Sequence, residues 1–141
     1  MQIIQLDTQI YVGPQIWASD MATLNRMKIG TIIVARPEGE TADQPTISAI
    51  REAADTFGIA IHQLPIVPGN ITDDDVRAYS AITTKAEGPV LAYCRSGMRA
   101  ASLWALGAVR QGQTPDEILR IATNVNFDLS ALAPRLAAIA A

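Results

Sequence analysis

The sequence is poor in the residues that build disulfides and metal centres. Its 141 residues include one cysteine and one histidine. A single cysteine excludes an internal disulfide, and one histidine without a second cysteine argues against a zinc site. We therefore expect neither a metal nor another cofactor, and a lone thiol of this kind is most easily kept reduced in the cytosol.

Long apolar runs and an excess of positive charge are missing as well. No stretch reaches the roughly 18 apolar residues of a membrane-spanning helix, and the N-terminus lacks the basic and then apolar order of a secretory signal. The formal net charge is −3, so the chain has no general positive field that would attract nucleic acid. These absences predict a cytoplasmic protein that uses neither a membrane nor a nucleic acid as its partner.

The chain does contain enough apolar residues for a core. Hydrophobic residues make up 49% of it, and without repeats or linkers we expect a single domain over residues 1–141. The alternation of strand and helix patterns is typical of an α/β domain. Strands are predicted over residues 3–6, 10–12, 31–35, 59–64 and 90–93, and helices begin near residues 19, 47, 72, 100, 114 and 128, the last one kinked near Pro134.

The stretch from residue 88 to 112, GPVLAYCRSGMRAASLWALGAVRQG, is the one around which the rest is expected to be arranged. A buried strand is followed by the loop CRSGMR at residues 94–99 and then by a helix that ends at Gly112. In such a unit the backbone N–H groups of the loop and of the first helical turn converge at the positive end of the helix dipole. An anion is therefore expected to bind there.

Cys94 and Arg99 are the candidate catalytic residues of this loop. N–H donors and two guanidinium groups around Cys94 would stabilise its thiolate, which is the nucleophilic form of the side chain. The planar guanidinium of Arg99 can grip an oxyanion at two points. A lone cysteine at the end of an apolar strand is more often a small buried side chain, but two arginines and a glycine are poor choices for filling a core. The surroundings favour the catalytic interpretation.

Several stretches of the chain resemble the phosphatase-like domain of the β-lactamase-hydrolase-like proteins. The resemblance covers most of the chain and is carried by GPVLAYCRSGMR at residues 88–99, LWAL at 103–106, YVGPQ at 11–15, RPEGE at 36–40 and LPIVPG at 64–69. It implies a fold similar to that of the protein tyrosine and dual-specificity phosphatases. We accordingly expect a three-layer α/β domain with a mainly parallel central sheet and the Cys94 loop at its carboxyl edge.

The predicted anion site extends beyond the two catalytic residues. The polar loop RPEGETADQP, residues 36–45, leaves the carboxyl end of a strand, where open α/β sheets place their ligands. In one interpretation Arg36 or an acid of this loop borders the Cys94 pocket, and in the other its charges only pair with one another in solvent. The predicted substrate-binding residues are Arg36, Arg95 at the rim and, through their backbone N–H groups, Ser96, Gly97 and Met98.

A thiolate in such a loop supports two chemistries, attack on phosphorus or attack on a sulfane sulfur that is then carried as a persulfide. Four residues separate Cys94 from Arg99, whereas the protein tyrosine and dual-specificity phosphatases place five there and rhodanese-type sulfurtransferases have the shorter spacing. Tyr93 stands where those phosphatases have histidine, and Ala100 stands where they have serine or threonine. The loop length therefore favours sulfur transfer, while the resemblance in fold favours a phosphatase.

A general acid would help to decide between the two chemistries, because a phosphatase acting on esters needs one and a sulfite or thiolate leaving group does not. Residues 65–71 contain no aspartate, and Asp73, Asp74 and Asp75 follow at a helix start. Acids at such a place are usually caps and partners of the helix dipole. They are candidates for the general acid only if the helix start turns them toward the pocket.

We expect a cysteine-dependent, phosphatase-like hydrolase that acts on a small anionic substrate through Cys94. The alternative is a rhodanese-type sulfurtransferase, a name that some members of the family carry, with thiosulfate or glutathione persulfide as the sulfane sulfur donor. A third interpretation is a domain that only binds an anion or senses oxidation at Cys94. Full-length relatives can carry a metallo-β-lactamase-type domain, so the resemblance also implies a separate protein of that fold as a partner.

Overall fold

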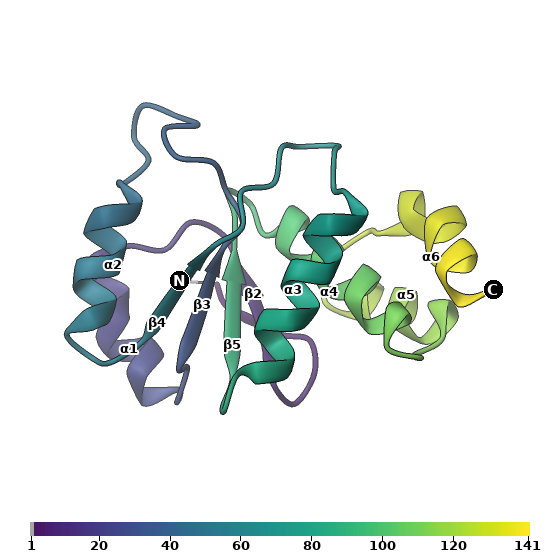
Figure 1. Ribbon diagram of the computed structural model, residues 1–141, viewed down its shortest axis with the longest axis horizontal. Coiled ribbons are helices and arrows are strands. Elements are labelled where there is room, and N and C mark those ends of the chain that lie inside the picture. Colours follow the sequence, from purple (N-terminus) through teal and green to yellow (C-terminus); the bar gives the residue numbers. More distant parts are fainter. Residues whose placement is uncertain (1) are drawn as a thin grey trace.

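A sheet of five strands in the order β1-β2-β5-β3-β4 forms the middle of the computed structural model, which describes residues 2–141 (Figure 1). Strands β2, β5, β3 and β4 run parallel to one another, and β1 pairs antiparallel with β2 at one edge. The sheet is thus mainly parallel, as predicted. The strands are β1 (Ile4–Gln5), β2 (Ile10–Gly13), β3 (Thr31–Val34), β4 (Ala60–Gln63) and β5 (Val90–Tyr93).

Helices cover both faces of this sheet, which makes the domain three layers thick (Figure 1). Helices α1 and α2 pack on one face, and α3 to α6 pack on the other. The helices are α1 (Met21–Arg26), α2 (Ile47–Asp55), α3 (Asp73–Lys85), α4 (Met98–Arg110), α5 (Pro115–Asn124) and α6 (Ala133–Ala140), with short 3₁₀ helices at η1 (Ala18–Asp20) and η2 (Ser130–Leu132). The three-layer α/β fold predicted from the sequence is confirmed.

Strand β5 lies in the centre of the sheet and contributes to two cores. Val90 and Ala92 face α3 and α4, and Leu91 and Tyr93 face α1 and α2. All four residues are buried, because both faces of a parallel strand are covered by helices. A short, uninterrupted apolar run is therefore what this position requires.

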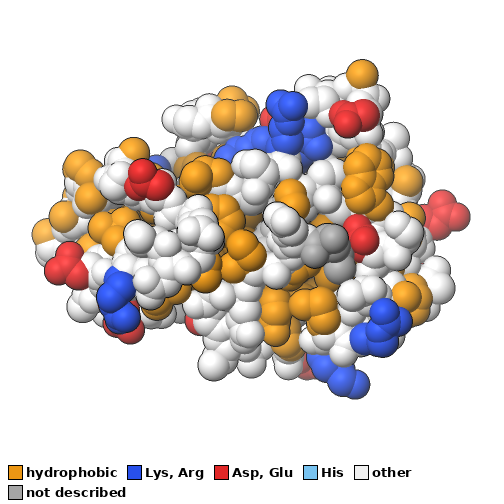
Figure 2. Space-filling model, turned by 180° about the vertical axis from the view of Figure 1, so that it is seen from behind, with side chains coloured by type: hydrophobic (Ala, Val, Ile, Leu, Met, Phe, Trp, Pro, Cys, Tyr) orange, Lys and Arg blue, Asp and Glu red, His pale blue; other side chains and the backbone are white. Residues whose placement is uncertain are grey.

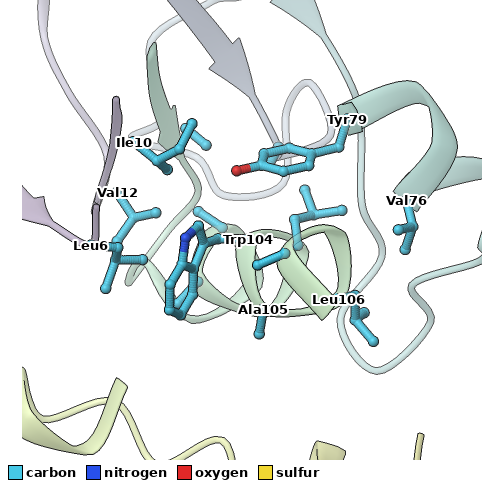
Figure 3. Packing of buried hydrophobic residues seen from close by; sticks show 14 of the residues in the cluster. Leu6, Ile10, Val12, Val76, Tyr79, Trp104, Ala105 and Leu106 are labelled. Carbon is cyan, nitrogen blue, oxygen red and sulfur yellow. The ribbon is translucent and has the colours of Figure 1, made fainter. Parts of the chain in front are cut away.

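Helix α4, which follows β5, is the central helix of the thicker layer. Every residue from Ala100 to Val109 is buried, since α4 packs on the sheet and is also contacted by α3, α5 and α6. Figure 3 shows its Trp104 among apolar side chains such as Ile10 and Tyr79. The indole Nε1–H of Trp104 donates to the carboxylate of Asp7 at 3.2 Å, which satisfies the polar atom of this buried ring. The middle of α4 is thus held against the sheet.

The end of the chain differs from the sequence prediction. We expected one helix from Asp128, kinked near Pro134, but the structure has η2 followed by a separate α6. Pro134 lies in the first turn of α6, where a missing N–H leaves no helical hydrogen bond unmade. The proline therefore helps to start a helix and does not bend one. Within residues 2–141, no helix combines the length and the apolar character needed to cross a membrane.

Candidate active site

The loops that leave the carboxyl ends of β3, β4 and β5 meet at one edge of the sheet. They border a cavity of about 570 Å³, together with residues from the end of the chain. Figure 2 shows Lys and Arg side chains gathered at the upper edge of the molecule, with hydrophobic side chains beside them. The residues lining the cavity are Glu40, Thr41, Pro68, Gly69, Ile71, Arg95, Ser96, Met98, Arg99, Ser102, Leu132 and Arg135.

Cys94 lies between β5 and α4, next to the residues that line this cavity. Its side chain is only 1% exposed, so burial alone would also suit a small apolar role. Its Sγ, however, accepts a hydrogen bond from the backbone N–H of Gly97 at 3.1 Å. This contact lies at the amino end of a 13-residue helix, where the dipole favours negative charge. The Sγ of Cys94 therefore lies where a backbone N–H donor and the start of a helix meet.

Gly97 makes this contact possible through its backbone conformation. Its φ is +97°, a region that residues with a Cβ rarely adopt. A Cβ at this position would lie 3.3 Å from the ring of Phe127 and 3.4 Å from the carbonyl carbon of Gly13. The turn and the close packing both require glycine. Helix α4 consequently begins at Met98, two residues earlier than the apolar spacing predicted.

Arg99 points toward the loop that follows β3. Its Nη1 and Nη2 donate to the two carboxylate oxygens of Glu40 at 2.9 and 2.8 Å, and Nη1 also donates to the carbonyl of Ile66 at 2.8 Å. The hydrogen bond to Glu40, opposed by burial and helped by the charge of Cys94, raises the pKa of Arg99. A hydrogen bond with the side chain of Cys94 also raises the pKa of Arg99. The contacts to Glu40 and Ile66 do not use Nε, so the edge formed by Nε and Nη2 is free to face Cys94 and an anion bound beside it.

Glu40 is held by a second guanidinium, that of Arg36. The Nε of Arg36 donates to Glu40 at 2.9 Å, and its Nη1 and Nη2 donate to Gln15 at 2.8 Å and Thr41 at 2.9 Å. The hydrogen bond from Arg99 lowers the pKa of Glu40, burial opposes this, and Arg36 lowers it further. Glu40 is thus a carboxylate fixed between two arginines, and it fixes the orientation of Arg99.

The structure brings most of the predicted site residues together. Arg95, Ser96, Met98 and Arg99 line the cavity, and Gly97 contacts Cys94. Arg36 is placed differently from its predicted role in substrate binding. It is 3% exposed and all three of its nitrogens bind protein groups, because the loop folds back and puts Glu40 between Arg36 and the cavity.

The three aspartates at the start of α3 are all engaged elsewhere. Asp75 and Thr72 form a reciprocal capping box, with the carboxylate of Asp75 accepting from the N–H of Thr72 at 2.9 Å. Asp74 pairs with Arg77, and Asp73 pairs with Arg135 at 3.0 Å. None of the three lines the cavity. Among the described residues, Glu40 is the one that contributes a carboxylate to its lining. The helix start acts as a cap and does not turn an acid inward.

Two contributors to the site were missed in the sequence. Glu40 had a signal, because an acid in residues 36–45 was one interpretation of that loop. Arg135 had none, since the last helix looked purely structural. It reaches the cavity because α6 packs against α4, a contact that sequence spacing does not reveal.

Tyr93 precedes Cys94, and its side chain lies in the core formed with α1 and α2. Burial raises the pKa of Tyr93 to about 12, with Gln15 and Arg36 lowering it in part. The phenol is therefore neutral at physiological pH. Its side chain lies on the opposite face of β5 from the core of α3 and α4, so it contributes to the packing behind the Cys94 loop.

Comparisons with solved structures agree with this fold. A structure from Neisseria meningitidis Z2491, described as a candidate phosphatase, is 33% identical, has a TM-score of 0.88 and covers 99% of each chain. The structure of PTPMT1 is 16% identical with a TM-score of 0.76, covering 98% of this chain and 96% of the other. At that identity the likeness shows the fold alone, which is that of the protein tyrosine and dual-specificity phosphatases.

Comparisons of sequence cover nearly the same residues. A Beta-lactamase hydrolase-like protein from Agrobacterium fabrum is 31% identical over 132 residues, which are 93% of this chain and 31% of that protein. The chain thus spans less than a third of the length of the curated relatives it matches. The family model for the phosphatase-like domain of these proteins matches residues 3–111. The chain therefore belongs to the family of phosphatase-like domains of the Beta-lactamase hydrolase-like proteins, as its sequence predicted.

Proposed function

We propose that this domain is a cysteine-dependent hydrolase of the phosphatase-like class that acts on a small phosphate ester. The observation that carries the proposal is the contact between Gly97 N–H and Cys94 Sγ at the start of α4, with Arg99 held beside it by Glu40. A stabilised thiolate and an oriented guanidinium are the two groups that attack on an oxyanionic phosphorus requires.

The reaction would proceed in two displacements. The thiolate of Cys94 attacks phosphorus, an S–P bond forms, and the P–O bond to the alcohol breaks with its electron pair leaving on oxygen. Water then attacks the cysteinyl phosphate, which breaks the S–P bond, restores the thiolate and releases inorganic phosphate. The free edge of Arg99 and the N–H groups of the loop bind the phosphoryl oxygens in both steps.

The supply of a proton to the leaving group limits which esters react. The aspartates of α3 are engaged in caps and ion pairs, and Glu40 is held as a carboxylate by two arginines. An alkoxide would have to leave without a protein acid, whereas a phenolate with electron-withdrawing substituents leaves readily. We expect activity to depend steeply on the leaving group.

The lack of an acid that supplies a proton to the leaving group favours sulfur transfer as a second candidate function. In that reaction the thiolate of Cys94 attacks the outer sulfur of thiosulfate, the S–S bond breaks and sulfite leaves with the electron pair. Cys94 then carries a persulfide, and a thiolate acceptor removes the sulfur. Sulfite leaves without a proton from the protein, so this reaction does not need a general acid at the site. The four-residue spacing from Cys94 to Arg99 also supports this candidate.

The test incubates the wild-type protein and Cys94→Ser with thiosulfate and, separately, with an activated aryl phosphate, and measures the intact mass of the protein and the phosphate released. Phosphate release that depends on Cys94, without a sulfur adduct, supports the hydrolase. One added sulfur atom, present in the wild type and absent in the serine variant, supports the sulfurtransferase instead. If neither product forms while phosphate still binds, the domain is a non-catalytic anion binder and the proposal fails.

A further inference from the structure

The cavity beside Cys94 is larger than the reacting group needs. Its volume of about 570 Å³ lies in the range of roughly 300–1,000 Å³ that is usual for pockets holding a whole small molecule. A phosphate or sulfonate group alone would fill a small part of it. The remaining volume can hold the rest of a substrate, and its lining indicates what kind of group would fit there.

The part of the lining that lies away from Cys94 is mostly apolar and includes one basic residue. Pro68, Ile71 and Leu132 contribute apolar surface, and Met98 does so with 41% of its surface exposed. These side chains favour an aliphatic or aromatic segment. Arg135 lines the same cavity from α6, an element beyond the residues 3–111 that the family model matches.

Arg135 is held in place and only partly satisfied. Its Nη1 donates to the carbonyl of Ile71 at 2.5 Å, and its Nη2 donates to the carboxylate of Asp73 at 3.0 Å. The side chain of Asp73 is 80% exposed and that of Arg135 is 33% exposed, so water weakens this ion pair. A guanidinium has five N–H donors, and these contacts leave several of them for another acceptor.

Arg135 and Arg99 contact the segment between β4 and α3 at two different places. Arg99 holds the segment between β4 and α3 at the carbonyl of Ile66, and Arg135 holds it at Ile71. Arg95 also lines the cavity but is exposed and adjacent to Cys94 in the loop, so it belongs with the reacting group. Arg135 contacts the carbonyl of Ile71, an apolar residue of the lining, so its charge lies beside the apolar part of the cavity.

From these contacts, and resting on the function proposed above, we infer that the substrate carries a second anionic group that binds Arg135. The substrate class is a small molecule with a reactive oxyanion or sulfane group, an apolar segment and a carboxylate or phosphate. Arg135 is then a residue that determines specificity, since it contacts the substrate away from the reacting atoms. The carbonyl of Ile71 orients it, and the exposed Asp73 is the group that the substrate anion competes with.

Binding of phosphonates, which do not react, tests this inference apart from catalysis. Calorimetry on the Cys94→Ser protein compares phenylphosphonate with phenylphosphonates that carry a para-carboxylate directly or through one or two methylenes. We expect at least one carboxylated ligand to bind about five- to tenfold more tightly, as for one charge-assisted contact in a partly exposed site. Adding Arg135→Gln should abolish this advantage and leave phenylphosphonate binding unchanged, while Arg135→Lys should retain part of it.

Two further variants complete the test. Asp73→Asn removes the competing carboxylate and should strengthen binding of the carboxylated ligand without affecting phenylphosphonate. Arg51→Gln, an exposed arginine on α2 over the other face of the sheet, should change neither. Equal weakening of both ligands by Arg135→Gln, or no advantage for any carboxylated ligand, would overturn the inference and leave the proposed function intact. Failure of every phosphonate to bind would overturn both.

Discussion

Two ion pairs border the same cavity and differ in how far water reaches them. In the pair of Arg99 with Glu40 the side chains are 12% and 21% exposed, and both carboxylate oxygens are bound. In the pair of Arg135 with Asp73 they are 33% and 80% exposed, with one contact. A shielded, bidentate pair fixes geometry, whereas an exposed, single contact can be exchanged. The cavity thus has a rigid end at the proposed catalytic residues and an adaptable end at Arg135.

Conservative substitution of the two arginines should show the largest contrast. We expect Arg99→Lys to lower kcat/KM for an activated aryl phosphate on the order of a thousandfold, because an ammonium cannot bind Glu40 and a phosphoryl group with planar geometry. Arg135→Lys should change the same parameter by less than about threefold for an uncharged leaving group. Steady-state kinetics of both variants provides the measurement. Similar losses in the two would contradict the assignment of separate roles.

The next largest contrast is expected in kcat, when the charge is removed from Glu40 or from Asp73. Glu40→Gln leaves Arg99 without its bidentate partner, and we expect kcat to fall roughly 10- to 100-fold with a smaller change in KM, as for loss of a supporting partner. Asp73→Asn is the matched control and should leave kcat within about twofold. If Glu40→Gln raised KM alone, the residue would act in binding and would not position Arg99.

The shielded pair should also give the protein an acid-dependent part of its stability. The pKa of Glu40 is lowered from an ordinary value of 4.5, so the folded state binds this proton less readily than the unfolded state. The contribution is fully present above about pH 4.5 and is lost as the pH falls through the lowered value. Urea unfolding from pH 7 to 3 should show the stability difference between wild type and Glu40→Gln shrinking below pH 4.5. Glu52→Gln, exposed on α2, controls for net charge, and a constant difference would contradict the prediction.

The smallest effect is expected at the start of α3. Asp75→Asn weakens the capping box with Thr72 and should lower the free energy of unfolding by about 0.5–1 kcal/mol. It should leave kcat/KM within about twofold, because Asp75 does not line the cavity. Chemical denaturation and steady-state kinetics measure the two quantities. A large loss of activity with unchanged stability would restore Asp75 as a candidate general acid.

Local chemistry explains why the fold and the proximity of the residues in the Cys94 loop could be predicted. A buried strand in a parallel sheet needs an apolar run, and residues 90–93 provide one. The order of strands and helices and the resemblance to a known family indicated three layers, which the structure has. Residues 94–99 are contiguous, so their proximity follows from the chain itself. The predicted starts of two helices, α4 at Met98 and α6 beside Pro134, differ from the structure, because a glycine turn and packing decide where those helices begin.

The implied partner of metallo-β-lactamase fold stays a prediction. The curated relatives are longer than this chain, which covers 31% of the one from Agrobacterium fabrum. A pull-down or co-purification with such a protein would test it. The predicted hydrolase and sulfurtransferase activities likewise depend on the mass measurement proposed above.

By itself the sequence determined the candidate nucleophile Cys94 and its immediate setting. Cys94, Gly97 and Arg99 lie within one short loop at a helix start, where backbone N–H groups must converge. Only the tertiary structure decided which groups meet Arg99 and what else lines the cavity. Glu40 and Arg99 are 59 positions apart, and Arg135 and Ile71 are 64 positions apart. Such pairs form because β3 lies beside β5 in the sheet and α6 packs on α4, and the order of packed elements is not encoded in the spacing of any single stretch.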